Sequence, residues 1–191
     1  LLFERERMEI VGRSGAIFGA RVGTTRVGIA NLLSPEPRLT VEGTAEGPTA
    51  DFLRYVQASG VRRMLGGVTD AMNAQGRGRL RLKLELPLND LAKTRTSGEF
   101  QFSNNALVVD SRVPQITAAT GRVAFTEDSL SIADLRGTLF GGPVAISGGS
   151  RAGVPLAVTA RGRGTAEGFG ALFDHPWRKR LSGGAAYVAT I

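Results

Sequence analysis

The stretch Arg79-Leu80-Arg81-Leu82-Lys83-Leu84-Glu85-Leu86 alternates charged residues and leucines without interruption. Successive side chains of a β-strand point to opposite faces, so the leucines share one face and the charges share the other. Pro87 follows directly, and because proline has no N–H to donate to a strand ladder, the strand is expected to end there. This stretch predicts a sheet with one apolar face and one polar face.

The same alternation recurs later in the chain, in the pairs Phe100 with Phe102, Val123 with Phe125, and Val144 with Ile146. Of the 191 residues, 26 are glycine, and 42% are hydrophobic. Glycine at this level, with many Val, Ile, Leu and Thr residues, is typical of short strands joined by tight turns. We therefore expect a mainly β fold with a few short helices, in which antiparallel strands follow one another as a meander.

Two segments, 98–107 and 121–130, each suggest a strand, a polar pair and the start of a returning strand. The polar pairs are Asn104-Asn105 and Glu127-Asp128. Asn and Asp tolerate left-handed backbone angles, so both pairs are predicted to form tight hairpin turns.

Two matches within the chain indicate an internal repeat. Phe3, Met8, Ile10, Gly15, Ile17, Phe18, Gly19 and Val22 recur as Phe125, Leu130, Ile132, Gly137, Leu139, Phe140, Gly141 and Val144, at an offset of 122. Residues 43–47 recur letter for letter as residues 164–168, at an offset of 121. We expect about one and a half copies of a long unit, with the second match marking a strand end before a helix in both copies.

Helical spacing is best in residues 48–72, where Ser59-Gly60 is expected to divide two short helices. A shorter counterpart is expected at 165–173. The predicted organisation is one continuous repeat-type domain: residues 1–47 are strands that end the preceding part of the repeat, 48–72 a helical insertion, 73–164 an antiparallel meander, and 165–191 a short helix, a basic loop and the start of the next strand. Because Leu1 is not a start Met and the last strand has no cap, both ends are expected to continue in a larger protein.

Catalytic and metal-binding residue types are scarce. There is no cysteine and the only histidine is His175, which argues against thiolate or histidine metal sites. Residues 76–78 and 162–164, both Gly-Arg-Gly, lack the Lys and Ser/Thr of a phosphate-binding loop and are interpreted as turn glycines. One hypothesis is an enzyme that uses Asp174 and His175, but the side chains of adjacent residues rarely face each other. We expect no enzyme, no metal and no cofactor.

The net charge of +7 is compatible with nucleic acid, anionic lipid or simple solubility. Aromatic residues, at 6%, are too few to give the stacking platforms of a single-strand nucleic-acid site, so no nucleic-acid partner is expected. No apolar run is long enough to span a membrane. Arg178, Lys179 and Arg180 are candidates for contact with lipid headgroups or an acidic partner.

The order of motifs along the chain resembles the YhdP family, large AsmA-like envelope proteins of Gram-negative bacteria. The motifs are Gly47-Pro48-Thr49 before a helix, the run from Gly76 to Leu88, Gly98–Asn105, Pro114, Gly121–Phe125, Phe140–Val144, and Leu181–Gly184 before a last strand. Each motif is structural and glycine-rich, and the resemblance covers the chain from about Gly15 onward.

The resemblance implies a fold and a function. Family members are anchored in the inner membrane by an N-terminal helix and extend through the periplasm. Their strands form a curved sheet like a half-pipe, a β-groove with an apolar channel, thought to carry phospholipid from the inner to the outer membrane and so support the outer-membrane barrier. The family is not known as an enzyme. This chain would then be a periplasmic segment of an inner-membrane-anchored protein and not itself transmembrane.

A sheet with an apolar face must cover that face, and acyl chains would do so at about 0.8 kcal/mol for each methylene buried. The candidate groove-facing residues are Leu80, Leu82, Leu84, Phe100, Phe102, Val123, Phe125, Ile132, Val144 and Ile146. Alternatively, these side chains fill a closed core against the 48–72 helices. In that case the chain is a structural or assembly scaffold of the envelope without a lipid track.

Overall fold

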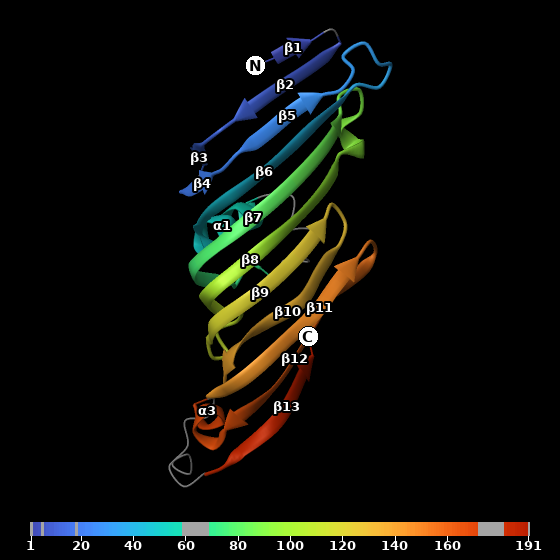
Figure 1. Cartoon of the computed structure of the whole chain (residues 1–191). Helices are drawn as coiled ribbons and strands as arrows, with labels where there is room; N and C mark the ends of the chain where they lie inside the picture. Colours follow the sequence, from blue (N-terminus) through green and yellow to red (C-terminus); the bar gives the residue numbers. More distant parts are fainter. Residues whose placement is uncertain (1, 5, 18, 59–68, 172–181, 191) are drawn as a thin grey trace.

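A computed structural model describes residues 2–4, 6–17, 19–58, 69–171 and 182–190. In this part of the chain, one sheet of thirteen strands is open rather than closed, and consecutive strands along it pair antiparallel (Figure 1). The strands are β1 (Leu2–Glu4), β2 (Arg7–Gly12), β3 (Gly15–Ile17), β4 (Ala20–Val22), β5 (Thr25–Ile29), β6 (Arg38–Pro48), β7 (Asn73–Pro87), β8 (Arg95–Val108), β9 (Ile116–Thr126), β10 (Leu130–Leu139), β11 (Gly142–Arg151), β12 (Val154–Thr165) and β13 (Gly184–Thr190). The predicted mainly β, curved meander is confirmed, and β7 ends at Pro87 as expected.

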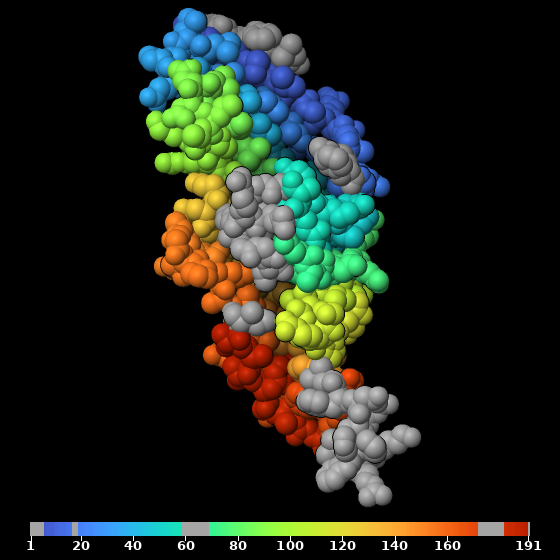
Figure 2. Space-filling model, turned by 180° about the vertical axis from the view of Figure 1, so that it is seen from behind, coloured from blue at the N-terminus to red at the C-terminus, as the bar shows by residue number. Residues whose placement is uncertain are grey.

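Helices are short. They are α1 (Thr49–Ala58), the 3-10 turn η1 (Leu91–Lys93) and α3 (Ala166–Gly170) in the described ranges. Figure 2 shows α1 on the face of the sheet opposite to the one seen in Figure 1. The second helix predicted after Ser59-Gly60 falls on residues 59–68, and the end of the predicted 165–173 helix falls on Phe173; both lie outside the described residues.

The repeat at an offset of 122 is a structural repeat. Gly15 of β3 lies opposite Val22 of β4, and the equivalent Gly137 of β10 lies opposite Val144 of β11. The second hairpin turns at Phe140-Gly141, where both residues have positive φ (54° and 73°), as a two-residue type I′ turn requires. Similar sequences therefore build the same hairpin in the same register.

The match at an offset of 121 marks the end of a strand before a helix in both copies, as predicted, although strand pairing aligns the two copies at a different offset. Val22 lies opposite Ala45 of β6, whereas Val144 lies opposite Gly162 of β12, so the structural offset is 117 (162 minus 45). The connection before β6 is longer than the one before β12, so equivalent paired residues stand further apart in the sequence in the first copy. Residues 43–47 end β6 directly before Pro48 and α1, and Gly164 and Thr165 end β12 before α3. Thr165 caps α3 by accepting a hydrogen bond from the Gly168 N–H (3.0 Å).

The turn predicted at Asn104-Asn105 was wrong, whereas the turn at Glu127-Asp128 is confirmed. β8 runs through the two asparagines, and its pairing with β9 shifts between Phe102 and Asn105. Asn104 has a left-handed φ of 54°, so its backbone preference produces a β-bulge and not a hairpin. Bulges also need residues that accept such angles, which is why a sequence pattern alone does not separate them from turns.

The Gly-Arg-Gly segments lie in strands and not in turns, which corrects the interpretation from sequence. Residues 162–164 belong to β12, and residues 76–78 belong to β7. Gly76 has φ +106° at a shift in the β7–β8 register, and a side chain there would collide with the Asn105 amide. Glycine is needed at this position for a bulge packed closely on a neighbouring strand.

The buried core lies at the ends of the strands next to α1. It comprises Ala74, Leu107, Ile116, Ala119, Leu135, Leu139, Val144 and Ile146. Several of these residues stand where β7 and β11 begin and where β8 and β10 end, and Leu53 of α1 packs against them. The apolar face is thus covered and tightly packed at the strand ends next to α1, whereas turns and loops lie at the other ends of these strands.

Candidate functional site

Strand pairing places the ten candidate groove residues on one face. Leu80 lies opposite Phe100, and Phe100 lies opposite Val123. Val123 in turn lies opposite Ile132 on β10. Residues directly opposite each other in antiparallel strands point to the same side, so this row crosses four strands on a single face. Leu82, Leu84, Phe102 and Phe125 stand two or four residues from members of this row on their own strands.

Val144 and Ile146 join the same face through β11. Ile146 lies opposite Leu135, and a bulge between Ile132 and Leu135 keeps both apolar residues of β10 on this side. However, Val144 and Ile146 are only 3% and 7% exposed and belong to the closed core. These two side chains are therefore poorly placed to contact a ligand.

Part of the face is covered by α1. The Phe52 ring of α1 meets Phe100 edge to face with ring centroids 5.1 Å apart, and Phe100 meets Phe102 in the same way at 4.9 Å. Phe102 and Ile132 also pack against the core. The closed-core alternative thus describes the helix-covered edge correctly.

The remainder of the face is half-buried, with no fully buried side chain among the residues that form it. This region, the open apolar strip, comprises Leu39, Val41, Leu82, Leu84, Leu86, Phe125 and Leu130. Leu39 lies opposite Leu86 and Val41 lies opposite Leu84, which extends the strip onto β6. Sequence reasoning omitted Leu39, Val41, Leu86 and Leu130 from the site, although alternation at Arg38-Leu39-Thr40-Val41 was the signal that could have found the first two.

Glycine and phenylalanine together make this strip continuous. Leu82 lies opposite Gly98, and Gly98 lies opposite Phe125. A side chain at Gly98 would collide with the Phe125 ring, so the ring lies over the glycine and fills the gap between strands. Phe100 covers Gly78 in the same manner. The surface across the strands is therefore apolar without a break at the glycines.

The opposite face carries interleaved charges. Arg79 Nε donates to Glu46 Oε1 (2.6 Å), and Lys83 Nζ lies 3.0 Å from Glu85 and 3.5 Å from Glu42. Hydrogen bonding to Glu85, followed by its charge and then by Glu42, raises the pKa of Lys83 above its usual range. These exposed pairs contribute little stability individually, but they keep this face hydrated.

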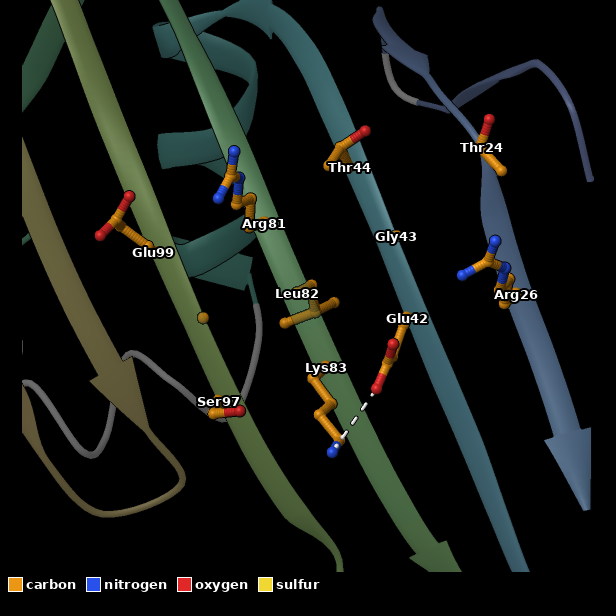
Figure 3. Close-up of a pocket in the computed structure, with 11 residues that line it drawn as sticks. Thr24, Arg26, Glu42, Gly43, Thr44, Arg81, Leu82, Lys83, Ser97 and Glu99 are labelled. Atoms are coloured by element: carbon orange, nitrogen blue, oxygen red, sulfur yellow. Dashed lines mark ion pairs between the residues drawn. The ribbon is translucent and has the colours of Figure 1, made fainter. Parts of the chain in front are cut away.

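A shallow trough of about 790 Å³ lies on this polar face, across β5 to β8 (Figure 3). Arg26, Arg81 and Lys83 line it together with Glu42 and Glu99. Because cations and carboxylates line it in a mixture, the trough has no strong preference for one sign of ligand charge.

Several predicted positions lie outside the described residues: Arg178, Lys179, Arg180, Asp174 and His175. Among the residues that are described, no group of His, Cys, Asp or Glu side chains could hold a metal ion. None of the helices in those same ranges is long and apolar enough to cross a membrane.

Comparison with known proteins identifies the chain over its whole length. The family model described as YhdP protein matches residues 1–191. Neither a curated protein nor a solved structure matches the chain. The family match indicates a bacterial envelope protein of the AsmA-like group and confirms the resemblance seen in the sequence.

Proposed function

We propose that this chain, which belongs to the YhdP family, is a segment of a lipid-transfer protein whose apolar groove carries phospholipid acyl chains between the inner and outer membranes. The observation that carries the proposal is the open apolar strip, where seven apolar side chains on one face are only half-buried. The segment would lie in the periplasm, in a protein anchored in the inner membrane elsewhere along its length. It would support the outer-membrane barrier without catalysing a reaction.

The dimensions of the strip suit an acyl chain. It crosses β6 to β10, five strands, which at about 4.8 Å per strand spacing spans about 19 Å. One leaflet of a bilayer, which an acyl chain crosses, is about 15 Å thick. A tail laid along the strip would gain about 0.8 kcal/mol for each methylene removed from water, and its headgroup would stay hydrated beyond the edge of the sheet.

The alternative is a structural or assembly scaffold of the cell envelope. The observation that favours it is the closed core, together with the cover that Phe52 provides over Phe100 and Phe102. If the apolar face were sealed along its whole length, partners would bind the polar face and no lipid would enter.

Site-specific photo-crosslinking separates the two functions. A benzophenone side chain placed at Leu82 lies on the open strip, and the matched control at the adjacent Arg81 lies on the polar face. With the chain incubated with phospholipid, we expect lipid adducts at Leu82 and at most a trace at Arg81. Absence of lipid adducts at Leu82, or equal yields at both positions, would overturn the proposal. In cell extracts, protein adducts at Arg81 without lipid at Leu82 would favour the scaffold.

A further inference from the structure

The polar face has two parts that differ in charge balance. On β6 to β9, cations alternate with carboxylates, as in the pair Arg79 with Glu46 and in Arg122, which lies 4.0 Å from Glu99 and 3.7 Å from Asp134. On β10 to β12, the same face carries Arg136, Arg161 and Arg163, here called the arginine surface. Within the described ranges, no ion pair or side-chain hydrogen bond involves any of the three.

Strand register brings these arginines together. Arg136 lies opposite Ala145, and Ala145 lies opposite Arg161. Arg136 and Arg161 are therefore separated by about 10 Å, two strand spacings, whereas Arg163 stands about 7 Å along β12 from Arg161. Three exposed guanidinium groups thus occupy one small area.

The neighbours of the arginine surface are small or uncharged. Ala145 lies between Arg136 and Arg161, Ala186 lies opposite Arg163, and Val188, which is 66% exposed, lies opposite Arg161. Among nearby acids, Asp134 already pairs with Arg122. Glu167 of α3 forms no ion pair with any of the three arginines in the described part of the chain. Nothing in the described surroundings compensates the positive charge.

We propose that the arginine surface binds the phosphate groups of anionic phospholipids at a bilayer surface. A guanidinium group presents paired N–H donors that match phosphate oxygens, and it holds its charge at any physiological pH. The exposed arginines, on one face of neighbouring strands, suit contact with a layer of headgroups. A protein interface usually contains a large anchoring side chain or a pocket that receives one. The residues beside the arginines, such as Ala145 and Ala186, provide neither of these features.

Docking through this surface leaves the open apolar strip free, because the two lie on opposite faces of the sheet. The inference rests on the proposed function, because it takes phospholipid to be the ligand of this protein. The two activities use different residues, so each can fail without the other.

Co-sedimentation of the chain with vesicles tests the inference. We expect binding to vesicles of 40% phosphatidylglycerol in phosphatidylcholine at 50 mM NaCl, and loss of binding at 500 mM NaCl or on pure phosphatidylcholine. Each arginine near an anionic membrane contributes about fivefold in partitioning, so R136Q/R161Q/R163Q is expected to bind about a hundredfold more weakly.

The matched control is R7Q/R38Q/R112Q, which lowers the net charge by the same amount, from +7 to +4, at arginines paired with Glu9, Glu36 and Asp110. It should keep most of the vesicle binding. An equal loss in both triple variants, or displacement of the chain from vesicles by poly-glutamate as effectively as by soluble phosphatidylglycerol, would overturn the inference.

Lipid capture at Leu82 from detergent micelles should be unchanged in R136Q/R161Q/R163Q. Vesicle binding without capture at Leu82 would refute the proposed function alone.

Discussion

At the scale of single residues, Asn105 joins three segments of the chain. Its side chain is fully buried, and its Nδ2 group donates to the Thr49 hydroxyl (2.9 Å) at the start of α1 and to the Arg77 carbonyl (3.1 Å) of β7. A buried amide of this kind is stabilising only while its partners remain in place. Asn105 therefore helps to determine where α1 sits on the sheet, and with it which apolar residues are covered.

Replacing Asn105 with alanine is expected to lower the free energy of unfolding by about 2 kcal/mol, because the buried Thr49 hydroxyl and the part-buried Arg77 carbonyl lose their donor. Gln101→Ala, an exposed position on the same strand, is the control and should change stability by less than about 0.5 kcal/mol. Urea unfolding followed by circular dichroism measures both. Equal stability of the two variants would show that the Asn105 hydrogen bonds contribute nothing net.

At the scale of elements, the β10–β11 hairpin and α3 are built around one glycine. Gly141 has a φ of +73°, and a Cβ there would lie 2.6 Å from the Thr165 hydroxyl oxygen that caps α3. In the first copy, Gly19 has a φ of +81°, and a Cβ there would collide with the carboxylate of Asp51 of α1. Both copies therefore set the start of a helix against the glycine of a hairpin turn.

Gly153 provides a matched control for Gly141, because it has the same φ of +73° but no atom near its Cβ position. Gly153→Ala should cost about 1 kcal/mol, the penalty of left-handed backbone. Gly141→Ala should cost about 2 kcal/mol, since it also disturbs the helix cap. The comparison is made by thermal or urea unfolding, and equal costs would mean that the contact with Thr165 is unimportant.

At the scale of the whole molecule, one sheet has an apolar face that is closed along one edge and half-open along the other. The closed part contains Val144, and the open apolar strip contains Leu84. Both regions consist of apolar side chains, but the side chains of the closed part are more deeply buried. They should therefore respond differently to the same kind of substitution.

Val144→Ala is expected to destabilise the protein by about 2 kcal/mol, because it leaves a cavity in a packed core. Leu84→Gln should cost about 1 kcal/mol or less in stability while reducing lipid capture by a crosslinker at Leu82 several-fold. Unfolding curves and adduct yields, measured on the same preparations, distinguish the two effects. If Leu84→Gln unfolds the protein as severely as a core substitution does, the strip is sealed and the scaffold function is favoured.

The amino-acid sequence was sufficient for the two-faced sheet. Alternation in Arg79–Leu86 is a local pattern of period two, and strand geometry converts it directly into faces. The shared face of Leu80, Phe100, Val123 and Ile132 followed, as did the hairpin repeat at an offset of 122. Sequence also pointed to the family, because glycine-rich motifs kept their order over the chain.

Tertiary structure alone decided which part of the apolar face stays open. That outcome depends on where α1 lies and on how Phe52 and Leu53 meet residues distant in sequence, and no local pattern encodes those contacts. The same reason applies to Asn105, whose polarity suggested an exposed turn until the fold surrounded it with Thr49 and Arg77. Alternation determines the side to which a side chain points, but only packing between distant segments determines what covers it.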